Sequence, residues 1–232
     1  MDIAIIGAGA AGCFCAVALK RSLPAAGVVV LEAGPRPLAK VAITGGGRCN
    51  LTNSFEGISR LAEAYPRGEN LMKRALSVFG WTQTWEWFER EGVPLVLQED
   101  NCVFPKSQDA MQIVRLLEGL CRSLGVEIRT GWKVASVCHE NGKYRIFREI
   151  PLPKGETSLP KGQIPASGAS EPNDNAESFD IVVVTSGGSP KMQGISFLEP
   201  LGLKIEPPVP SLFTFNINDK SLRSLMGCVV EN

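Results

Sequence analysis

The sequence predicts an α/β fold: a Rossmann-like parallel β-sheet covered by helices, an antiparallel β-meander, and the beginning of a second, mainly β domain. Two observations lead to this prediction. Short, mainly apolar runs at Ile3–Ile6, Val28–Leu31 and Asp180–Val184 are typical of strands buried on both faces of a parallel sheet. A glycine-rich turn and a helical pattern lie between the first two runs, which is the order of a βαβ unit.

The first glycine-rich turn has the spacing of a dinucleotide-binding motif, Gly7-x-Gly9-x-x-Gly12. Gly7 would permit the sharp turn out of the first strand, and Gly9 would let a pyrophosphate approach the backbone. Gly12 would let the helix, which begins at Ala10, pack against that strand. Glu32 ends the second strand and would accept hydrogen bonds from a ribose diol while repelling a 2′-phosphate. The alternative is a purely structural βαβ turn.

A second glycine-rich segment spans Thr44–Asn50. Three adjacent glycines do not suit the interior of a helix or strand, so we expect backbone that passes close to a flat or phosphate-bearing ligand. Arg48 could offer a bidentate fork to such a ligand. A simple NAD domain has no evident need of this second loop, whereas the longer FAD requires more backbone around it. The alternative is a flexible surface loop.

The later part of the chain predicts an antiparallel pair of strands, Trp132–Cys138 with Tyr144–Phe147, joined by the hairpin turn Asn141-Gly142. The apolar run that ends at Val184 continues into Thr185-Ser186-Gly187-Gly188. Ligands of α/β sheets bind at the carboxyl ends of the strands, so we expect this segment to border the same ligand as the first turn.

These segments resemble the BaiN-like family of NAD(P)/FAD-dependent oxidoreductases, within the glutathione-reductase-type flavoproteins. The segments that carry the resemblance are IIGAGAAG, LEAGPRPLAKVAITGGGRCNLTN, CVFPKSQDA, IVVVTSGG and EPPVPSLFTF. The resemblance implies an FAD-binding domain in which the adenine is met by a backbone group of the meander. The cofactor-binding residues that it implies are Gly7, Gly9, Ala10, Ala11, Gly12, Glu32, Ala33, Arg36, Lys40, Thr44, Gly45, Gly46, Gly47, Arg48, Cys49, Asn50, Val134, Ser186, Gly187 and Gly188.

The resemblance also implies an enzyme, an FAD-dependent oxidoreductase. It would pass a hydride from NAD(P)H through the flavin to an electron-poor small molecule, such as an activated alkene. No catalytic acid or base follows from the sequence. Two alternatives remain open: an NAD-dependent dehydrogenase on a single Rossmann unit, and a non-catalytic nucleotide-binding scaffold.

We expect an FAD-binding domain at residues 1–190 and the beginning of a second, substrate domain at 191–232, with Leu212–Ile217 as its first strand. Residues 151–178 are rich in Pro, Gly and Ser and predict an excursion without a packed element, either passive or used to dock a partner. The family resemblance implies a longer chain and an alanine-threonine-glycine motif where this sequence has Thr185-Ser186-Gly187. We therefore expect that part of the flavin pocket is absent and that this chain alone has little activity.

The composition of the 232-residue chain argues against several classes of function. Lys plus Arg and Asp plus Glu both number 24, so a strongly basic nucleic-acid-binding surface is not expected. The seven cysteines have no CxxC spacing and there is one histidine, which predicts reduced thiols and no metal site. No apolar run reaches the ~18 residues of a membrane span and no signal peptide is visible. We expect a cytoplasmic protein with a small-molecule substrate and no nucleic-acid, membrane or evident protein partner.

Three further features have both a structural and a functional interpretation. Trp81, Trp85 and Phe88 share a helical face, which favours core packing over an aromatic lid on the flavin. Cys49 has no CxxC partner, so we interpret it as a packing residue and not as a redox centre. His139 lies next to the predicted hairpin turn and is expected on the surface, not as a catalytic base.

Overall fold

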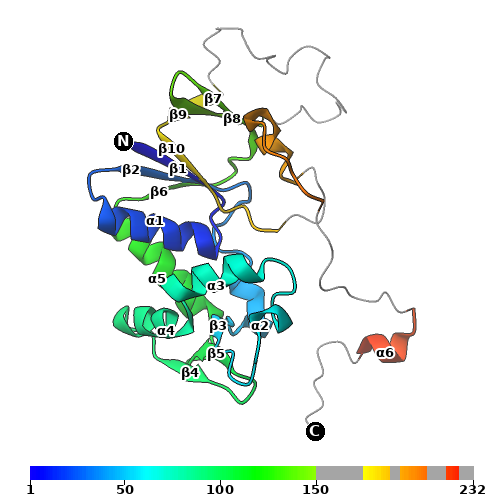
Figure 1. Ribbon diagram of the computed structural model, residues 1–232. Helices are drawn as coiled ribbons and strands as arrows, with labels where there is room; N and C mark the ends of the chain where they lie inside the picture. Colours follow the sequence, from blue (N-terminus) through cyan, green and yellow to red (C-terminus); the bar gives the residue numbers. More distant parts are fainter. Residues whose placement is uncertain (150–174, 189–193, 208–217, 225–232) are drawn as a thin grey trace.

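The computed structural model describes residues 1–149, 175–188, 194–207 and 218–224. Its centre is a four-stranded parallel sheet in the order β10-β1-β2-β6 (Figure 1). The strands are β1 (Asp2–Ile6), β2 (Gly27–Leu31), β6 (Glu127–Arg129) and β10 (Ile181–Val184). The predicted α/β fold with a parallel sheet is therefore confirmed.

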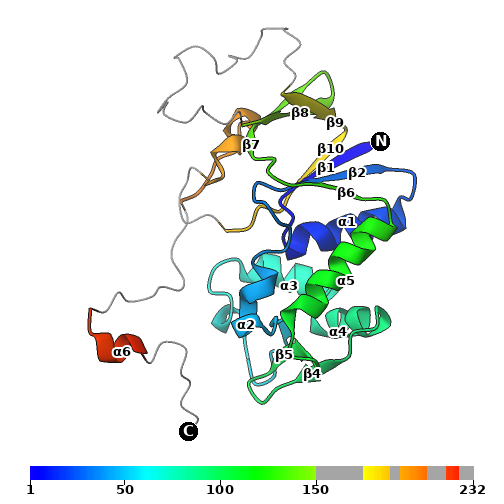
Figure 2. The same cartoon turned by 180° about the vertical axis from the view of Figure 1, so that it is seen from behind.

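Helices cover one face of this sheet, and a small antiparallel sheet lies over the other (Figure 1, Figure 2). Helices α1 (Ala10–Ser22) and α5 (Ala110–Ser123) share a buried cluster with Ile3 and Ile5. The neighbouring residues Ala4 and Ile6 belong to the cluster on the opposite face. Because side chains alternate along a strand, β1 buries both of its faces, which explains its continuous apolar run.

The antiparallel sheet consists of β7 (Val134–Glu140), β8 (Lys143–Arg148) and β9 (Ala176–Phe179), in that order. Asn141 and Gly142 join β7 to β8 with φ values of 51° and 75°, the left-handed conformation of a tight hairpin turn. The predicted hairpin is confirmed, although its first strand begins at Val134 and not at Trp132.

The predicted end of the excursion is wrong, because residues 176–178 belong to β9 and pair with β8. The sequence of this strand, Ala-Glu-Ser-Phe, contains no β-branched residue. Pairing with β8 and the burial of Phe179 stabilise it where local preference does not. The preceding residues, 151–174, lie outside the described residues, so the docking role considered for them stays a prediction.

A third group of elements lies between β2 and α5 along the chain. It contains the single turns η1 (Val41–Ile43), α2 (Thr44–Gly47) and η2 (Leu61–Glu63), the helices α3 (Glu69–Val78) and α4 (Trp81–Arg90), and the strands β3 (Thr52–Asn53), β4 (Leu95–Leu97) and β5 (Cys102–Pro105). The three strands form a small sheet in the order β3-β5-β4, which the sequence did not predict. On α4, Phe88 is buried in the main core and Trp85 packs against it, as the core interpretation requires.

The structure describes only part of the predicted second domain. The turn η4 (Ser196–Leu201) packs on β7, where Phe197 is buried in one cluster with Val137 and Ile146. A short helix, α6 (Lys220–Ser224), is also described. The strand expected at Leu212–Ile217 lies outside the described residues. The division into two domains stays a prediction, and η4 is attached to the first of them.

Candidate functional site

Two of the three glycines in the first turn are required by the packing of the protein itself. Gly7 has φ +106°, and a Cβ there would lie 2.7 Å from the carbonyl oxygen of Thr185. A Cβ on Gly12 would lie 1.9 Å from the carbonyl oxygen of Gly7 and 2.8 Å from Thr185 Oγ1. The Thr185 hydroxyl in turn contacts the carbonyl oxygens of Ile6 and Gly7, at 3.0 and 2.9 Å. The start of α1 is therefore packed directly against the ends of β1 and β10.

Unlike Gly7 and Gly12, Gly9 is not required to be glycine by contacts with the described residues. Its φ and ψ of −82° and −169° are available to any residue, and in the described structure nothing lies within 4 Å of a Cβ built there. Gly9 is the N-cap of α1, so no side chain accepts from the first N–H groups of the helix. These free donors and the helix dipole form an anion site, and the missing side chain leaves room above it.

Glu32, the first residue after β2, is fixed by two backbone donors. The N–H of Ala8 donates to its Oε2 at 2.9 Å, and the N–H of Gly34 donates to its Oε1 at 2.7 Å. The carboxylate thus connects the turn after β1 to the turn after β2. Each carboxylate oxygen retains acceptor capacity for a further donor, such as a ribose hydroxyl.

Two cavities meet at Gly7, Glu32 and Ser186, at the carboxyl ends of β1, β2 and β10. The larger has a volume of about 720 Å³, and the smaller has a volume of about 360 Å³. The predicted residues that line the larger cavity are Gly7, Gly9, Ala10, Ala11, Glu32, Arg36, Lys40, Thr44, Cys49, Asn50, Ser186 and Gly187. Those that line the smaller are Gly7, Glu32, Ala33, Val134 and Ser186.

The other predicted site residues lie outside both linings: Gly12, Gly45, Gly46, Gly47, Arg48 and Gly188. Arg48 is directed elsewhere, since its Nε donates to the carbonyl oxygen of Gly45 at 3.0 Å and its guanidinium lies 4.4 Å from the centre of the Phe104 ring. A Cβ on Gly45 would lie 2.8 Å from the backbone nitrogen of Asn50. Arg48 and the three adjacent glycines therefore shape the loop beside the cavity and are not in its lining.

The second glycine-rich segment is not a regular helix, although α2 has helix-like hydrogen bonds. Gly45 and Gly46 have φ values of 57° and 68°, so the turn is left-handed at its centre. This conformation explains why glycine occupies these positions. The turn brings Thr44 and Asn50 to the larger cavity from its two ends.

Two cations lie on the segment that follows β2. Arg36 and Lys40 both line the larger cavity, and neither has an ion-pair partner among the described residues. Lys40 reaches across towards the loop after β10, because its Nζ lies 3.7 Å from a Cβ built on Gly187. Unpaired cations next to the N-terminus of α1 make this part of the cavity favourable for a phosphate-bearing ligand.

Cys49 is buried and His139 is exposed, as the sequence indicated. Cys49 is 3% exposed, and burial raises the pKa of its thiol to about 11, so the thiol is neutral near pH 7. Its side chain packs with the main core although one edge reaches the cavity. His139 is exposed on β7, with its ring centre 4.8 Å from that of Tyr144, and it lines neither cavity.

Comparison of the sequence with known protein families agrees with the Rossmann-like fold described above. Residues 1–192 match the family described as HI0933-like protein Rossmann domain. The chain belongs to this family. In the part of the chain that the structure describes, no helix is long and apolar enough to span a membrane, and no three His, Cys, Asp or Glu residues are grouped as metal ligands.

Two curated relatives illustrate the range of the similarity. A 3-dehydro-bile acid delta(4,6)-reductase of Clostridium scindens is 34% identical over 135 residues, which cover 58% of this chain and 32% of that protein. A ribosomal RNA dihydrouridine synthase of Haemophilus influenzae is 26% identical over 228 residues, which cover 96% of this chain and 51% of that protein. The chain therefore spans about a third to a half of the length of these relatives.

Among solved structures, an S-allyl-L-cysteine S-oxygenase from Allium sativum has a TM-score of 0.41 and 19% identity, covering 80% of this chain and 36% of that protein. This likeness is too weak to support a statement about function.

Sequence reasoning missed much of the apolar wall of the larger cavity in this HI0933-like domain. The missed residues are Ala8, Phe14, Leu38, Ala39, Val41, Leu51, Phe79, Thr84, Phe88, Ile113 and Leu117. In the smaller cavity they are Ile6, Leu31, Trp132, Lys133, Ala135, Glu149, Gly194, Ser196 and Phe197. Helical spacing identifies the buried face of α5 but does not reveal that a cavity borders it.

Proposed function

We propose that this chain binds FAD along the two cavities, as the nucleotide-binding part of an oxidoreductase. The observation that carries this proposal is Gly9. The fold does not require glycine there, and the residue keeps space open in front of free helix N–H groups. A pyrophosphate is the group that such a site accommodates best.

Each neighbouring residue then has a role that follows from its position. Glu32 would accept from the adenosine ribose, and its charge would disfavour a 2′-phosphate at this site. Arg36 and Lys40 would neutralise the pyrophosphate. The backbone of Val134 would border the adenine in the smaller cavity. The remaining predicted residues of the larger cavity would lie beside the flavin: Thr44, Cys49, Asn50, Ser186 and Gly187.

We further propose that the complete protein reduces an activated carbon–carbon double bond of a small molecule, with NAD(P)H as the source of hydride. FAD held in this site would supply hydride-transfer chemistry: a hydride from NAD(P)H would reach the electron-poor carbon, and a proton from solvent would complete the reduction at the other carbon. The protein residues around it would orient the ring and exclude water. The names of the two curated relatives support the reaction class, since one is a reductase of a 3-dehydro-bile acid and the other forms dihydrouridine in ribosomal RNA.

The same names leave a second substrate class, an RNA base, to be tested against the small molecule. The equal numbers of basic and acidic residues in this chain favour the small molecule, because RNA binding rests on an excess of Lys and Arg. Reduction of an RNA uridine by the complete protein, without activity on a small-molecule enone, would reverse this preference.

A pair of matched glycine variants tests the FAD site. Nothing lies within 4 Å of a Cβ at Gly9 or at Gly119, which lies on α5 away from both cavities. We expect Gly9→Val to weaken FAD and ADP binding about tenfold or more, since its side chain would occupy the pyrophosphate path. Gly119→Val should leave binding unchanged. Both affinities are measured by calorimetric titration of the 232-residue chain.

Unchanged FAD affinity in Gly9→Val would contradict the proposed site. Binding of NAD⁺ without binding of FAD would favour the alternative of an NAD-dependent dehydrogenase.

A further inference from the structure

The residues that line the larger cavity fall into two groups with different chemistry. One group, here called the polar track, consists of the first glycine turn with Arg36 and Lys40. The other group, here called the apolar arm, consists of Phe14, Val41, Phe79, Phe88, Ile113 and Leu117. The polar track accounts for a nucleotide, whereas the apolar arm has no role in holding phosphates or ribose.

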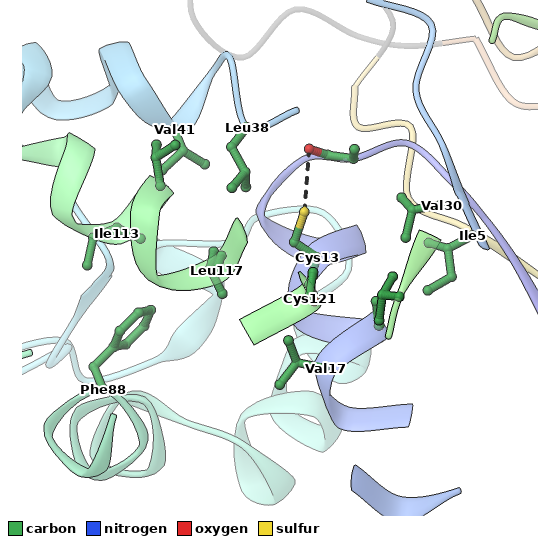
Figure 3. Close-up of a cluster of buried hydrophobic side chains, with 14 of the residues drawn as sticks. Ile5, Cys13, Val17, Val30, Leu38, Val41, Phe88, Ile113, Leu117 and Cys121 are labelled. Atoms are coloured by element: carbon green, nitrogen blue, oxygen red, sulfur yellow. Dashed lines mark hydrogen bonds between the residues drawn. The ribbon is translucent and has the colours of Figure 1, made fainter. Parts of the chain in front are cut away.

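Aromatic side chains from separate elements form the arm. Phe88 of α4 points towards Ile113 and Leu117 of α5, as Figure 3 shows. On the α1 side, the ring centre of Phe14 lies 5.2 Å from that of Phe79 in an edge-on arrangement. Trp87 packs against two of these rings, because its ring centre lies 4.8 Å from that of Phe14 and 4.8 Å from that of Phe88. Aromatic side chains held in this way make a preformed, rigid wall.

The few polar groups near the arm offer nothing to a charged ligand. The Thr84 hydroxyl donates to the carbonyl oxygen of Gly80 at 2.8 Å, so its proton is already used. The Cys49 thiol is neutral near pH 7, because burial raises its pKa to about 11. Of the described residues that line the larger cavity, the cations are Arg36 and Lys40, in the segment after β2, where Lys40 directly precedes Val41.

We propose that the apolar arm is a binding site for an uncharged, apolar ring compound, separate from the nucleotide track. A cavity lined by Phe, Ile and Leu holds water poorly and gains free energy when apolar surface enters it. Aromatic walls favour a flat ring, which can pack against them face-on or edge-on. This inference goes beyond the proposed function, because the arm would bind such a compound whether or not FAD is bound or any hydride is transferred.

The apolar edge of the flavin ring itself is a competing occupant of the arm. FAD carries this ring and ADP does not, whereas both would fill the track at Gly9 and Glu32. A competition experiment with the two nucleotides therefore separates a ring-compound site from a flavin site.

The probe is N-phenyl-1-naphthylamine, an uncharged ring compound whose fluorescence rises in apolar surroundings. We expect saturable binding to the 232-residue chain that neither ADP nor FAD displaces at saturation. Displacement by FAD but not by ADP would overturn the proposal, because the flavin would then occupy the arm. Absence of saturable binding would overturn it as well. FAD affinity is measured separately by titration, so failure of the FAD site is distinguishable from failure of the arm.

Two adjacent residues provide a matched pair of variants. Phe79 lines the arm and is 39% exposed, whereas Val78 is 79% exposed and lines neither cavity. We expect Phe79→Asp to weaken probe binding about tenfold, because a carboxylate would have to remain solvated at the wall. Val78→Asp should have no effect. An equal loss in both variants would place the probe on the exposed surface of α3 and overturn the proposal. If Phe79→Asp does not fold, the nucleotide competition on the unaltered chain still decides.

Discussion

Replacing Gly12 with alanine tests how closely α1 is packed behind the glycine turn. The added Cβ would lie 1.9 Å from the carbonyl oxygen of Gly7, whereas ordinary contact begins near 3.4 Å. The helix or the turn must therefore shift by about 1.5 Å in a close-packed region. The second neighbour, Thr185 Oγ1 at 2.8 Å, prevents an easy sideways movement.

The expected cost follows from this overlap. Overpacking typically costs 1–3 kcal/mol, and contact with rigid backbone places Gly12→Ala at the upper end, about 3 kcal/mol. For a chain of this size, that loss lowers the Tm by about 6–12 °C. Gly119→Ala is the control, because nothing lies within 4 Å of its Cβ on α5, and alanine there should raise stability by about 0.5–1 kcal/mol.

Thermal unfolding followed by circular dichroism measures both changes. If Gly12→Ala unfolds at the temperature of the unaltered chain, then α1 does not approach β1 as closely as the structure indicates. The assignment of Gly12 to helix–strand packing would then be refuted.

Three further predictions concern the site and its support. Glu32→Ala should weaken ADP and FAD binding about 10- to 100-fold, because the ribose would lose its hydrogen-bond acceptor and so would the N–H groups of Ala8 and Gly34. An unchanged ADP affinity in titration would remove Glu32 from the site. Hydrogen bonds from Arg21 lower the pKa of Glu91 in the folded chain. This pair therefore stabilises the fold at pH values above the unfolded-state pKa of about 4.3. The stabilisation is lost as the pH falls through the lower folded-state pKa. Glu91→Gln should therefore cost about 1 kcal/mol in urea unfolding at pH 7, a modest effect because Arg21 is 40% exposed. The cost should shrink as pH falls through the lowered folded-state pKa, and a cost that does not change with pH would contradict the ion pair. Cys49, with a pKa of about 11, should react slowly with iodoacetamide at neutral pH in the folded chain, and rapid alkylation would show that the thiol is accessible and ionised. Cys49→Ala should leave FAD affinity within about twofold.

Local chemistry made the first glycine-rich turn and its surroundings predictable from the sequence. Gly7 and Gly12 follow from the steric needs of a tight strand–helix turn, and Glu32 follows from its place at the end of β2. The Asn141-Gly142 turn was predictable for the same reason, since few residues adopt two successive positive φ values. Each of these features depends on neighbours along the chain.

Features that depend on contacts between distant segments were not predictable. Strand β9 forms because it pairs with β8, although its four residues have little strand preference of their own. The contact of Arg48 with Phe104, a residue of β5 in the small sheet, was not indicated by the sequence, and the role of Arg48 at a ligand stays a prediction. The apolar arm arises where α1, α4 and α5 meet, and helical spacing shows only which face of each helix is buried.

The central claim, that the two cavities form an FAD site, is tested most directly by identifying the bound nucleotide. The 232-residue chain is incubated with equal amounts of FAD and NAD⁺, separated from free ligand, and its visible absorbance spectrum is recorded. Heat then releases the ligand for identification by mass spectrometry. We predict a yellow protein that releases FAD. A colourless protein that cannot be loaded with FAD and releases NAD⁺ would contradict the account.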